Sequence, residues 1–133
     1  MCFVLLVEDN RTFRTSLKEM LEFRLPDLRI GEACDGDEAL DKLKTTKPDL
    51  VFMDIRLPGK NGLEVTRIIK AAYSSVEVVI LTSHDIPEYR EAAFQSGASQ
   101  FFTKGSVGSD EIADFVRSAL QRRGMDQEPQ AAR

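Results

Sequence analysis

Residues 50–62 read LVFMDIRLPGKNG: four apolar residues, a single aspartate at position 54, and then a turn that contains proline and glycine. A short apolar run bounded by turn residues is typical of a strand that is buried on both faces. After the turn, apolar residues recur at the spacing of one helix face, at Val65, Ile68, Ile69 and Ala72. This stretch therefore predicts a buried strand followed by an amphipathic helix.

The same alternation of strand and helix runs through the rest of the chain. Short apolar runs predict strands at 3–7, 29–33, 50–53, 76–81 and 100–102. Strict alternation with helices implies right-handed crossovers and a parallel sheet that is covered on both faces. Five such units predict an α/β protein with the flavodoxin-like, doubly wound (βα)5 fold, whose five-stranded parallel sheet has the order 2-1-3-4-5.

Several helical segments carry signals at their ends. The first has a single apolar stripe, made of Phe13, Leu17, Met20, Leu21 and the aliphatic stem of Arg24. The fourth opens with Asp85 and Glu88 at the spacing of a capping box and stops at Gly97. The fifth begins at Ser109 and closes at Gly124. We therefore predict one domain over residues 1–123, followed by a flexible tail or linker over residues 124–133.

Composition excludes several classes of protein. The chain has 133 residues, of which 42% are hydrophobic and 30% charged, with a net charge of −4, as expected for one globular domain. It contains no apolar run long enough to cross a membrane, and its net charge disfavours binding to nucleic acid without sequence preference. Cys2 and Cys34 lack the spacing of a metal site, and the start MCFVLLVEDN lacks the basic region of a signal peptide. These features predict a cytoplasmic protein.

Polar residues follow four of the predicted strands: Glu8, Asp9, Asp54, Thr82 and Lys104. The carboxyl ends of parallel strands share one edge of the sheet, where ligands bind in this class of fold. Each residue alone has an ordinary explanation as a cap, a turn residue or a surface charge. Three crowded carboxylates, however, repel one another and need positive charge. Lys104 supplies one charge, and a divalent cation among oxygen ligands, most simply Mg²⁺, supplies two.

A metal beside a carboxylate, a hydroxyl and an ammonium group is suited to phosphoryl transfer. Asp54 is the candidate nucleophile because it ends the most buried strand. Glu8 and Asp9 are better placed as metal ligands. Thr82 would donate a hydrogen bond to one phosphoryl oxygen, and Lys104 would pair with another.

At these residues the chain resembles the receiver domains of two-component response regulators. The matching stretches are VEDN (7–10), VFMDIRLPGKNG (51–62), VVILTS (78–83) and GASQFFTK (97–104), and the resemblance covers roughly residues 3–121. It implies phosphorylation of Asp54 by a sensor histidine kinase and a conformational switch through Thr82 and Phe101. It also implies that Mg²⁺ is held by Glu8, Asp9, Asp54 and the backbone carbonyl of Arg56. Phe101 stands where the family often has tyrosine, and Gly105 where many members have proline.

The resulting hypothesis is a signalling domain that catalyses only its own phosphorylation and dephosphorylation and is otherwise no enzyme. One alternative, a haloacid dehalogenase-like phosphatase, needs a second aspartate where this chain has Arg56. The other is a receiver-like binding module that takes no phosphate. We expect phosphorylation to promote a homodimer, with Tyr89, Arg90 and Arg117 as exposed contacts. We expect no membrane association and no direct DNA binding by this chain, with DNA bound only through a helix-turn-helix domain beyond it.

Overall fold

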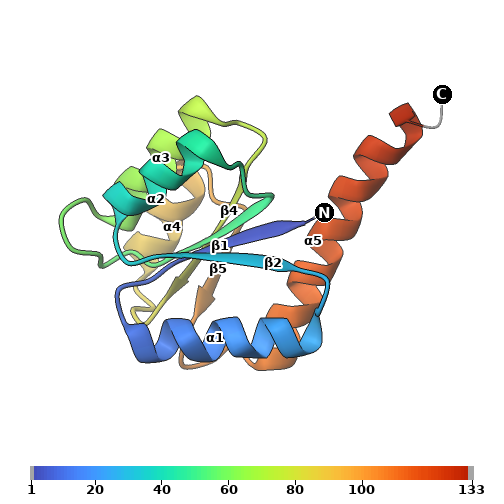
Figure 1. Ribbon diagram of the computed structural model, residues 1–133. Coiled ribbons are helices and arrows are strands. Elements are labelled where there is room, and N and C mark those ends of the chain that lie inside the picture. The colour runs from blue at the N-terminus through green and yellow to red at the C-terminus, as the bar shows by residue number, and fades with distance from the viewer. Residues whose placement is uncertain (1, 132–133) are drawn as a thin grey trace.

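The computed structural model describes residues 2–131, and the side chains of residues 2–123. Five strands form one parallel sheet in the order β2-β1-β3-β4-β5 (Figure 1). The strands are β1 (Phe3–Val7), β2 (Arg29–Ala33), β3 (Leu50–Met53), β4 (Glu77–Thr82) and β5 (Gln100–Thr103). The helices are α1 (Arg11–Arg24), α2 (Gly36–Thr45), α3 (Gly62–Ala72), α4 (Pro87–Gln95) and α5 (Ser109–Ala131). The predicted fold and strand order are confirmed.

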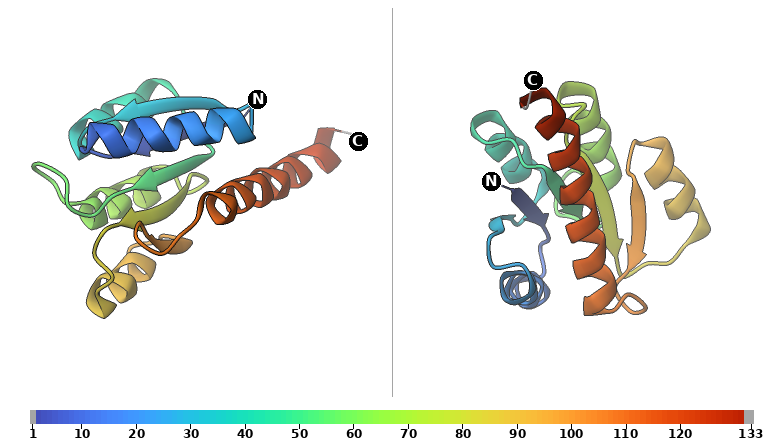
Figure 2. Two further views of the ribbon diagram at one scale, coloured as in Figure 1. Left: turned by 90° about the horizontal axis from the view of Figure 1, so that it is seen from below. Right: turned by 90° about the vertical axis from the view of Figure 1, so that its right-hand side faces the viewer.

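Helices cover both faces of the sheet (Figures 1 and 2). Because successive strand residues point to opposite faces, each strand contributes to two cores. Leu5 and Met53 belong to the core under α2, α3 and α4, whereas Leu6 and Phe52 belong to the core under α1 and α5. All four residues of β3 are buried, as expected for the central strand of such a sheet.

The hydrogen-bond ladder continues just beyond the carboxyl ends of the strands. The amide of Glu8 donates to the carbonyl of Ala33 (3.0 Å), that of Asp54 to Val7 (3.1 Å) and that of Lys104 to Thr82 (2.8 Å). These bonds fix the backbone of the first residues after β1, β3 and β5 against their neighbouring strands. The polar residues at this edge are therefore positioned by the sheet itself.

Polar side chains cap three of the helices, but the predicted cap of α4 is wrong. Asn10, Asp35 and Asn61 accept backbone hydrogen bonds at the starts of α1, α2 and α3. The residue before α4 is Ile86, which makes no capping side-chain bond. Asp85 lies instead 3.5 Å from the Arg90 guanidinium. Proline at the first position of α4 needs no amide partner, which lets the helix begin without a polar cap.

The buried face of α3 differs from the apolar stripe in the sequence. Val65 and Ile69 are fully buried, but Ile68 is 37% exposed and Ala72 is also exposed. The sheet-facing side includes Thr66, whose hydroxyl donates to the Gly62 carbonyl (2.8 Å) and is thereby satisfied.

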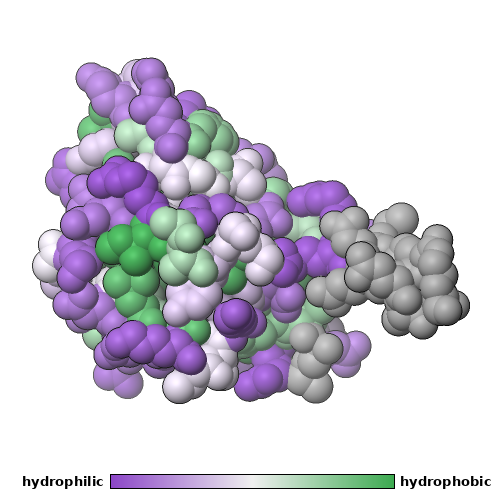
Figure 3. Space-filling model, turned by 90° about the horizontal axis from the view of Figure 1, so that it is seen from above, coloured by the Kyte–Doolittle hydropathy of each residue, from purple (hydrophilic) through white to green (hydrophobic). Residues whose placement is uncertain are grey.

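Seen from above, on the side of α2 and α3, the surface carries a hydrophobic area among hydrophilic residues (Figure 3).

Helix α5 continues through Gly124 to Ala131, so the helix end predicted at Gly124 is wrong. Figure 2 shows the helix projecting past the sheet. Near its last described side chains, Arg123 donates to the Asp49 carboxylate (3.2 Å) and to the Ser75 carbonyl (2.7 Å). The division of the chain at residue 123 stays a prediction. Within residues 2–131, no helix has the length and hydrophobicity of a membrane span.

Candidate functional site

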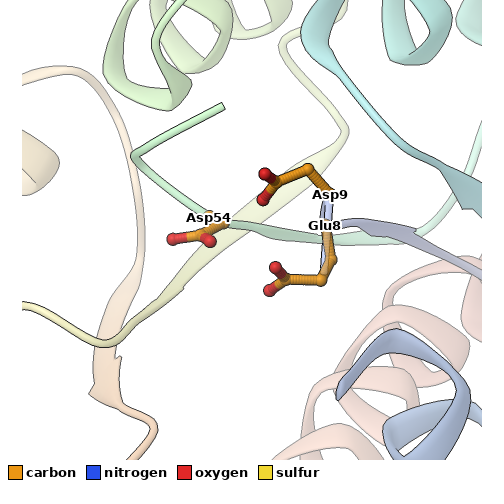
Figure 4. A group of neighbouring side chains, drawn as sticks. All are labelled: Glu8, Asp9 and Asp54. Carbon is orange, nitrogen blue, oxygen red and sulfur yellow. The ribbon is translucent and has the colours of Figure 1, made fainter. Parts of the chain in front are cut away.

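Three carboxylates meet at the carboxyl edge of the sheet. Glu8 and Asp9 follow β1, Asp54 follows β3, and their carboxyl groups point into one space (Figure 4). Each contributes an oxygen that lies within 4.8 Å of the other two. Glu8 is 4% and Asp54 7% exposed, whereas Asp9 is exposed. The structure thus brings together the acidic residues that the sequence analysis singled out.

Lys104 reaches into this acidic cluster from the end of β5. Its Nζ lies 2.6 Å from Glu8 Oε1 and 3.3 Å from Asp54 Oδ2. The side chain is 13% exposed, so these ion pairs are largely shielded from water. The ammonium also lies 4.4 Å from the centre of the Phe13 ring. One lysine therefore contacts two of the three carboxylates directly.

The hydrogen bonds to the Glu8 carboxylate do not fully offset the loss of its hydration on burial. Its Oε2 accepts a hydrogen bond from the Asn10 amide (3.0 Å). Burial nevertheless raises the pKa of Glu8 above its ordinary value, the hydrogen bonds from Lys104 and Asn10 oppose this rise, and the nearby charge of Asp54 adds to it. Three carboxylates with one lysine leave room for further positive charge. This all-oxygen donor set fits a hard divalent cation such as Mg²⁺.

If the cluster binds Mg²⁺, Asp9→Asn should weaken that binding about tenfold or more, because it removes one carboxylate charge from the donor set. Titration calorimetry of the metal alone measures the change. Asp114→Asn is the matched control, because Asp114 is exposed on α5 and pairs with Arg117 (2.8 Å). Equal Mg²⁺ affinity of the Asp9→Asn chain and the unaltered chain would contradict a metal role for Asp9.

The backbone around Asp54 is held from two sides. Asp54 Oδ1 accepts a hydrogen bond from the Ile55 amide (2.7 Å), and the Gly62 amide donates to the Ile55 carbonyl (2.7 Å). Gly62 packs directly against Asp54: a Cβ at position 62 would lie 1.8 Å from the Asp54 carbonyl oxygen. Gly62 was not among the predicted site residues. The available signal was a glycine inside a helix, directly after its Asn61 cap, where ordinary turn geometry does not call for one.

The two predicted switch residues are both buried. Thr82 is fully buried at the end of β4, and its Oγ1 accepts a hydrogen bond from the His84 amide (3.3 Å). Phe101 on β5 is 3% exposed, and the Arg90 guanidinium lies 4.6 Å from its ring centre. The described residues thus hold Phe101 inward, with a charged residue of α4 above it.

A second set of contacts joins α4 to the loop after Asp54. The Arg56 guanidinium lies 3.4 Å from the Tyr89 hydroxyl and 5.9 Å from its ring centre. His84 meets the same ring edge-on at 6.4 Å between centroids. Tyr89 is therefore half-buried and not exposed as predicted, whereas Arg90 and Arg117 are exposed. The role of the three residues as contacts stays a prediction.

Two details of the predicted site concern the backbone. The role of the Arg56 carbonyl as a metal ligand stays a prediction. The structure describes no cis peptide bond within residues 2–131, so the Lys104–Gly105 bond is trans.

Comparison with known proteins points to one family. A family model described as the response regulator receiver domain matches residues 4–117. Response regulator GacA of Pseudomonas viridiflava is 35% identical over 115 residues, covering 86% of this chain and 53% of that protein. Response regulator MprA of Mycobacterium sp. (strain KMS) is 31% identical over 126 residues, covering 95% of this chain and 54% of that protein. The chain spans about half the length of these curated relatives.

Solved structures show the same similarity. A two-component response regulator of the LuxR family from Aurantimonas sp. SI85-9A1 is 32% identical, with a TM-score of 0.83 over 91% of this chain and 86% of that chain. A CheY-like response regulator receiver domain protein from Methanospirillum hungatei JF-1 has a TM-score of 0.86 over 95% of this chain and 98% of that chain. At 21% identity, the second comparison supports the fold alone.

Proposed function

The chain belongs to the response regulator receiver domain family, and on that premise we propose that Asp54 accepts a phosphoryl group from a sensor histidine kinase. The observation that carries the proposal is the surroundings of this carboxylate. Asp54 is 7% exposed, lies beside two other carboxylates, and has the Lys104 ammonium 3.3 Å from Oδ2. Oδ1 accepts a hydrogen bond from the Ile55 amide at 2.7 Å, and Oδ2 accepts the longer one from Lys104 at 3.3 Å. We assign Oδ2, the more weakly held oxygen, as the nucleophile.

In the proposed reaction, an oxygen of Asp54 forms a bond to phosphorus while the bond from phosphorus to the imidazole nitrogen of the kinase breaks. That nitrogen keeps the electron pair of the broken bond. Lys104 meets the negative charge of the transferred group, because its ammonium is already within reach of Asp54. The buried Thr82 hydroxyl is assigned as a donor to a phosphoryl oxygen. A bound Mg²⁺ would supply two further positive charges against the phosphoryl oxygens and the Glu8 and Asp9 carboxylates.

Phosphorylation by a small donor tests this function without the kinase. The chain is incubated with acetyl phosphate and Mg²⁺, and its intact mass is measured. We expect one phosphoryl group per chain, mapped to Asp54 by fragmentation after borohydride reduction of the acyl phosphate. Excess EDTA should stop the uptake, and undiminished uptake in EDTA would remove Mg²⁺ from the mechanism. No uptake under any condition would favour the receiver-like binding module that takes no phosphate.

Lys104→Ala should leave the fold intact but impair the response to phosphorylation. Phosphorylated Asp54 carries about two negative charges where its carboxylate carried one, so that with Glu8 and Asp9 the site holds about four. Without Lys104 these groups lose their nearest protein cation. We expect the shift of the Phe101 amide signal on addition of beryllofluoride and Mg²⁺ to be lost in nuclear magnetic resonance spectra. Lys60→Ala is the control, because Lys60 pairs with the exposed Asp37 on α2. An unaltered Phe101 response in the Lys104→Ala chain would count against this role.

We further propose that phosphorylation promotes self-association through the face formed by α4, β5 and α5. Arg90 contacts Phe101, and Arg90 and Arg117 are exposed, so a movement of Phe101 would alter this charged surface. Sedimentation should show a larger species with beryllofluoride than without it, and no binding of duplex DNA by this chain. Equal sedimentation in both states would leave a different protein as the output partner. We assign any DNA binding to an output domain outside this chain. We also propose that the protein acts in the cytoplasm.

A further inference from the structure

We propose that Phe13 is a positioning residue for Lys104: its ring face holds the ammonium against Glu8 and Asp54 before any phosphoryl group arrives. The inference deepens the proposed function and rests on it, because Lys104 acts there on the phosphoryl group. Its basis is the distance of 4.4 Å between Lys104 Nζ and the centre of the Phe13 ring. This is the shortest cation–π contact among the described side chains.

The ammonium group has three close partners, two carboxylates and one ring. A lysine ammonium can donate up to three hydrogen bonds. Glu8 Oε1 lies 2.6 Å and Asp54 Oδ2 3.3 Å from Nζ. The third partner is the negative face of the Phe13 ring, to which cations are attracted. Since the Lys104 side chain is only 13% exposed, this contact is partly desolvated and stronger than the same contact in water.

The position of Phe13 is fixed by the same segment that carries the carboxylates. Asn10 directly follows Asp9 and caps α1 by accepting a hydrogen bond from the Phe13 amide (3.0 Å). Phe13 therefore sits in the first turn of α1, a few residues from Glu8 in the sequence and facing the lysine that follows β5. The ring also packs against the core under α1 and α5, which limits its freedom. The segment that carries Glu8 and Asp9 therefore leads directly into the helical turn that carries the ring in contact with Lys104.

A hollow beside the Phe13 ring could receive the Lys104 side chain if the ring were absent. A small hollow of about 140 Å³ lies between α1 and the loop after β5, and both Phe13 and Lys104 line it. Its other lining residues are Ser16, Leu17, Met20, Val107, Ser109 and Ile112. Replacing the ring by a smaller aliphatic side chain enlarges this hollow and removes one of the three partners. The ammonium would then spend part of its time turned away from Asp54.

The contact itself is tested in the unphosphorylated protein by nuclear magnetic resonance. Protons on Lys104 Cε should be shifted upfield by the ring current of Phe13, with the signals assigned by their absence in Lys104→Arg. Phe13→Leu should abolish the upfield shift, and Phe13→Tyr should retain it. Phe115→Leu is the matched control, because it removes an aromatic ring from the same core, where Phe115 packs edge-on against Phe102 at 5.5 Å. An upfield shift that persists in Phe13→Leu, or is absent from the unaltered chain, would overturn the contact.

The consequence for the site is tested by titration with beryllofluoride and Mg²⁺. We expect the dissociation constant to rise about fivefold in Phe13→Leu, or about 1 kcal/mol, and to stay unchanged in Phe13→Tyr and Phe115→Leu. An equal affinity in Phe13→Leu, with the ring-current shift lost, would overturn the positioning role. Failure of the unaltered chain to bind beryllofluoride would contradict the proposed function instead. The ring-current result would still decide whether Phe13 holds Lys104.

Discussion

An Asp54→Asn chain should take up no phosphoryl group from acetyl phosphate and Mg²⁺, whereas the unaltered chain takes up one. Asparagine has nearly the same shape, so it fills the same buried position beside Ile55 and Lys104, but its neutral amide is not a competent nucleophile. The neighbouring carboxylates do not replace it. Glu8 is held by Lys104 at 2.6 Å and by the Asn10 amide at 3.0 Å. We therefore expect a complete loss rather than a reduced rate.

Intact-protein mass spectrometry measures this loss under the conditions that label the unaltered chain. Asp114→Asn serves as the control, because it makes the same chemical change on the exposed surface of α5. Circular dichroism should show the same secondary structure for all three chains. Uptake by Asp54→Asn at the unaltered rate would show that another residue accepts the phosphoryl group and would refute the assignment.

Gly62→Ala should lower the free energy of unfolding by about 3 kcal/mol, the upper part of the range for overpacked sites. The added Cβ would lie 1.8 Å from the Asp54 carbonyl oxygen and 2.9 Å from the Ile55 Cα. Both atoms belong to the backbone, so the clash cannot be relieved by rotating a side chain. Relief requires α3 to move away from the residue that follows β3. The same movement would displace Asp54, so phosphorylation should slow as well.

Urea unfolding followed by circular dichroism gives the difference in free energy. Gly108→Ala is the matched control, because a Cβ at position 108 meets no atom within 4 Å. We expect the control to unfold at nearly the same urea concentration as the unaltered chain. Equal unfolding midpoints for Gly62→Ala and Gly108→Ala would mean that the close approach of α3 to Asp54 is easily relaxed.

The fold was predictable because its main signals are local and repeated. Apolar runs mark the strands, and their alternation with helices determines a parallel sheet. The errors arose where weaker signals competed. At α4, Asp85 has the right spacing for a cap, but proline at the first helical position removes the need for one. At Gly124, a single glycine costs a helix only about 1 kcal/mol, which does not oblige it to end. On α3, Thr66 can be buried because its hydroxyl bonds to the Gly62 carbonyl within the helix, so a polar residue occupies part of the buried face while Ile68 is exposed.

The acidic cluster was predictable from the topology of the sheet. The roles of Phe13 and Gly62 beside it were not. Residues that end parallel strands must share one edge of the sheet, so Glu8, Asp54 and Lys104 could be grouped from the sequence alone. The contact of Phe13 with Lys104 depends on how α1 lies against the loop after β5. In the sequence, Phe13 is one apolar residue in a helical stripe. The clash that reserves position 62 for glycine likewise exists only once α3 is packed against β3.

The contact between Arg56 and Tyr89 makes one side chain a natural optical reporter. The chain contains no tryptophan and two tyrosines. In a Tyr73→Phe chain excited at a wavelength that tyrosine absorbs and phenylalanine does not, the emission would therefore come from Tyr89, which is flanked by the Arg56 guanidinium and the His84 ring. Arg56 is two residues from Asp54, and Tyr89 is on α4. The intensity of that emission would follow the coupling between the loop and the helix in real time, without an attached dye.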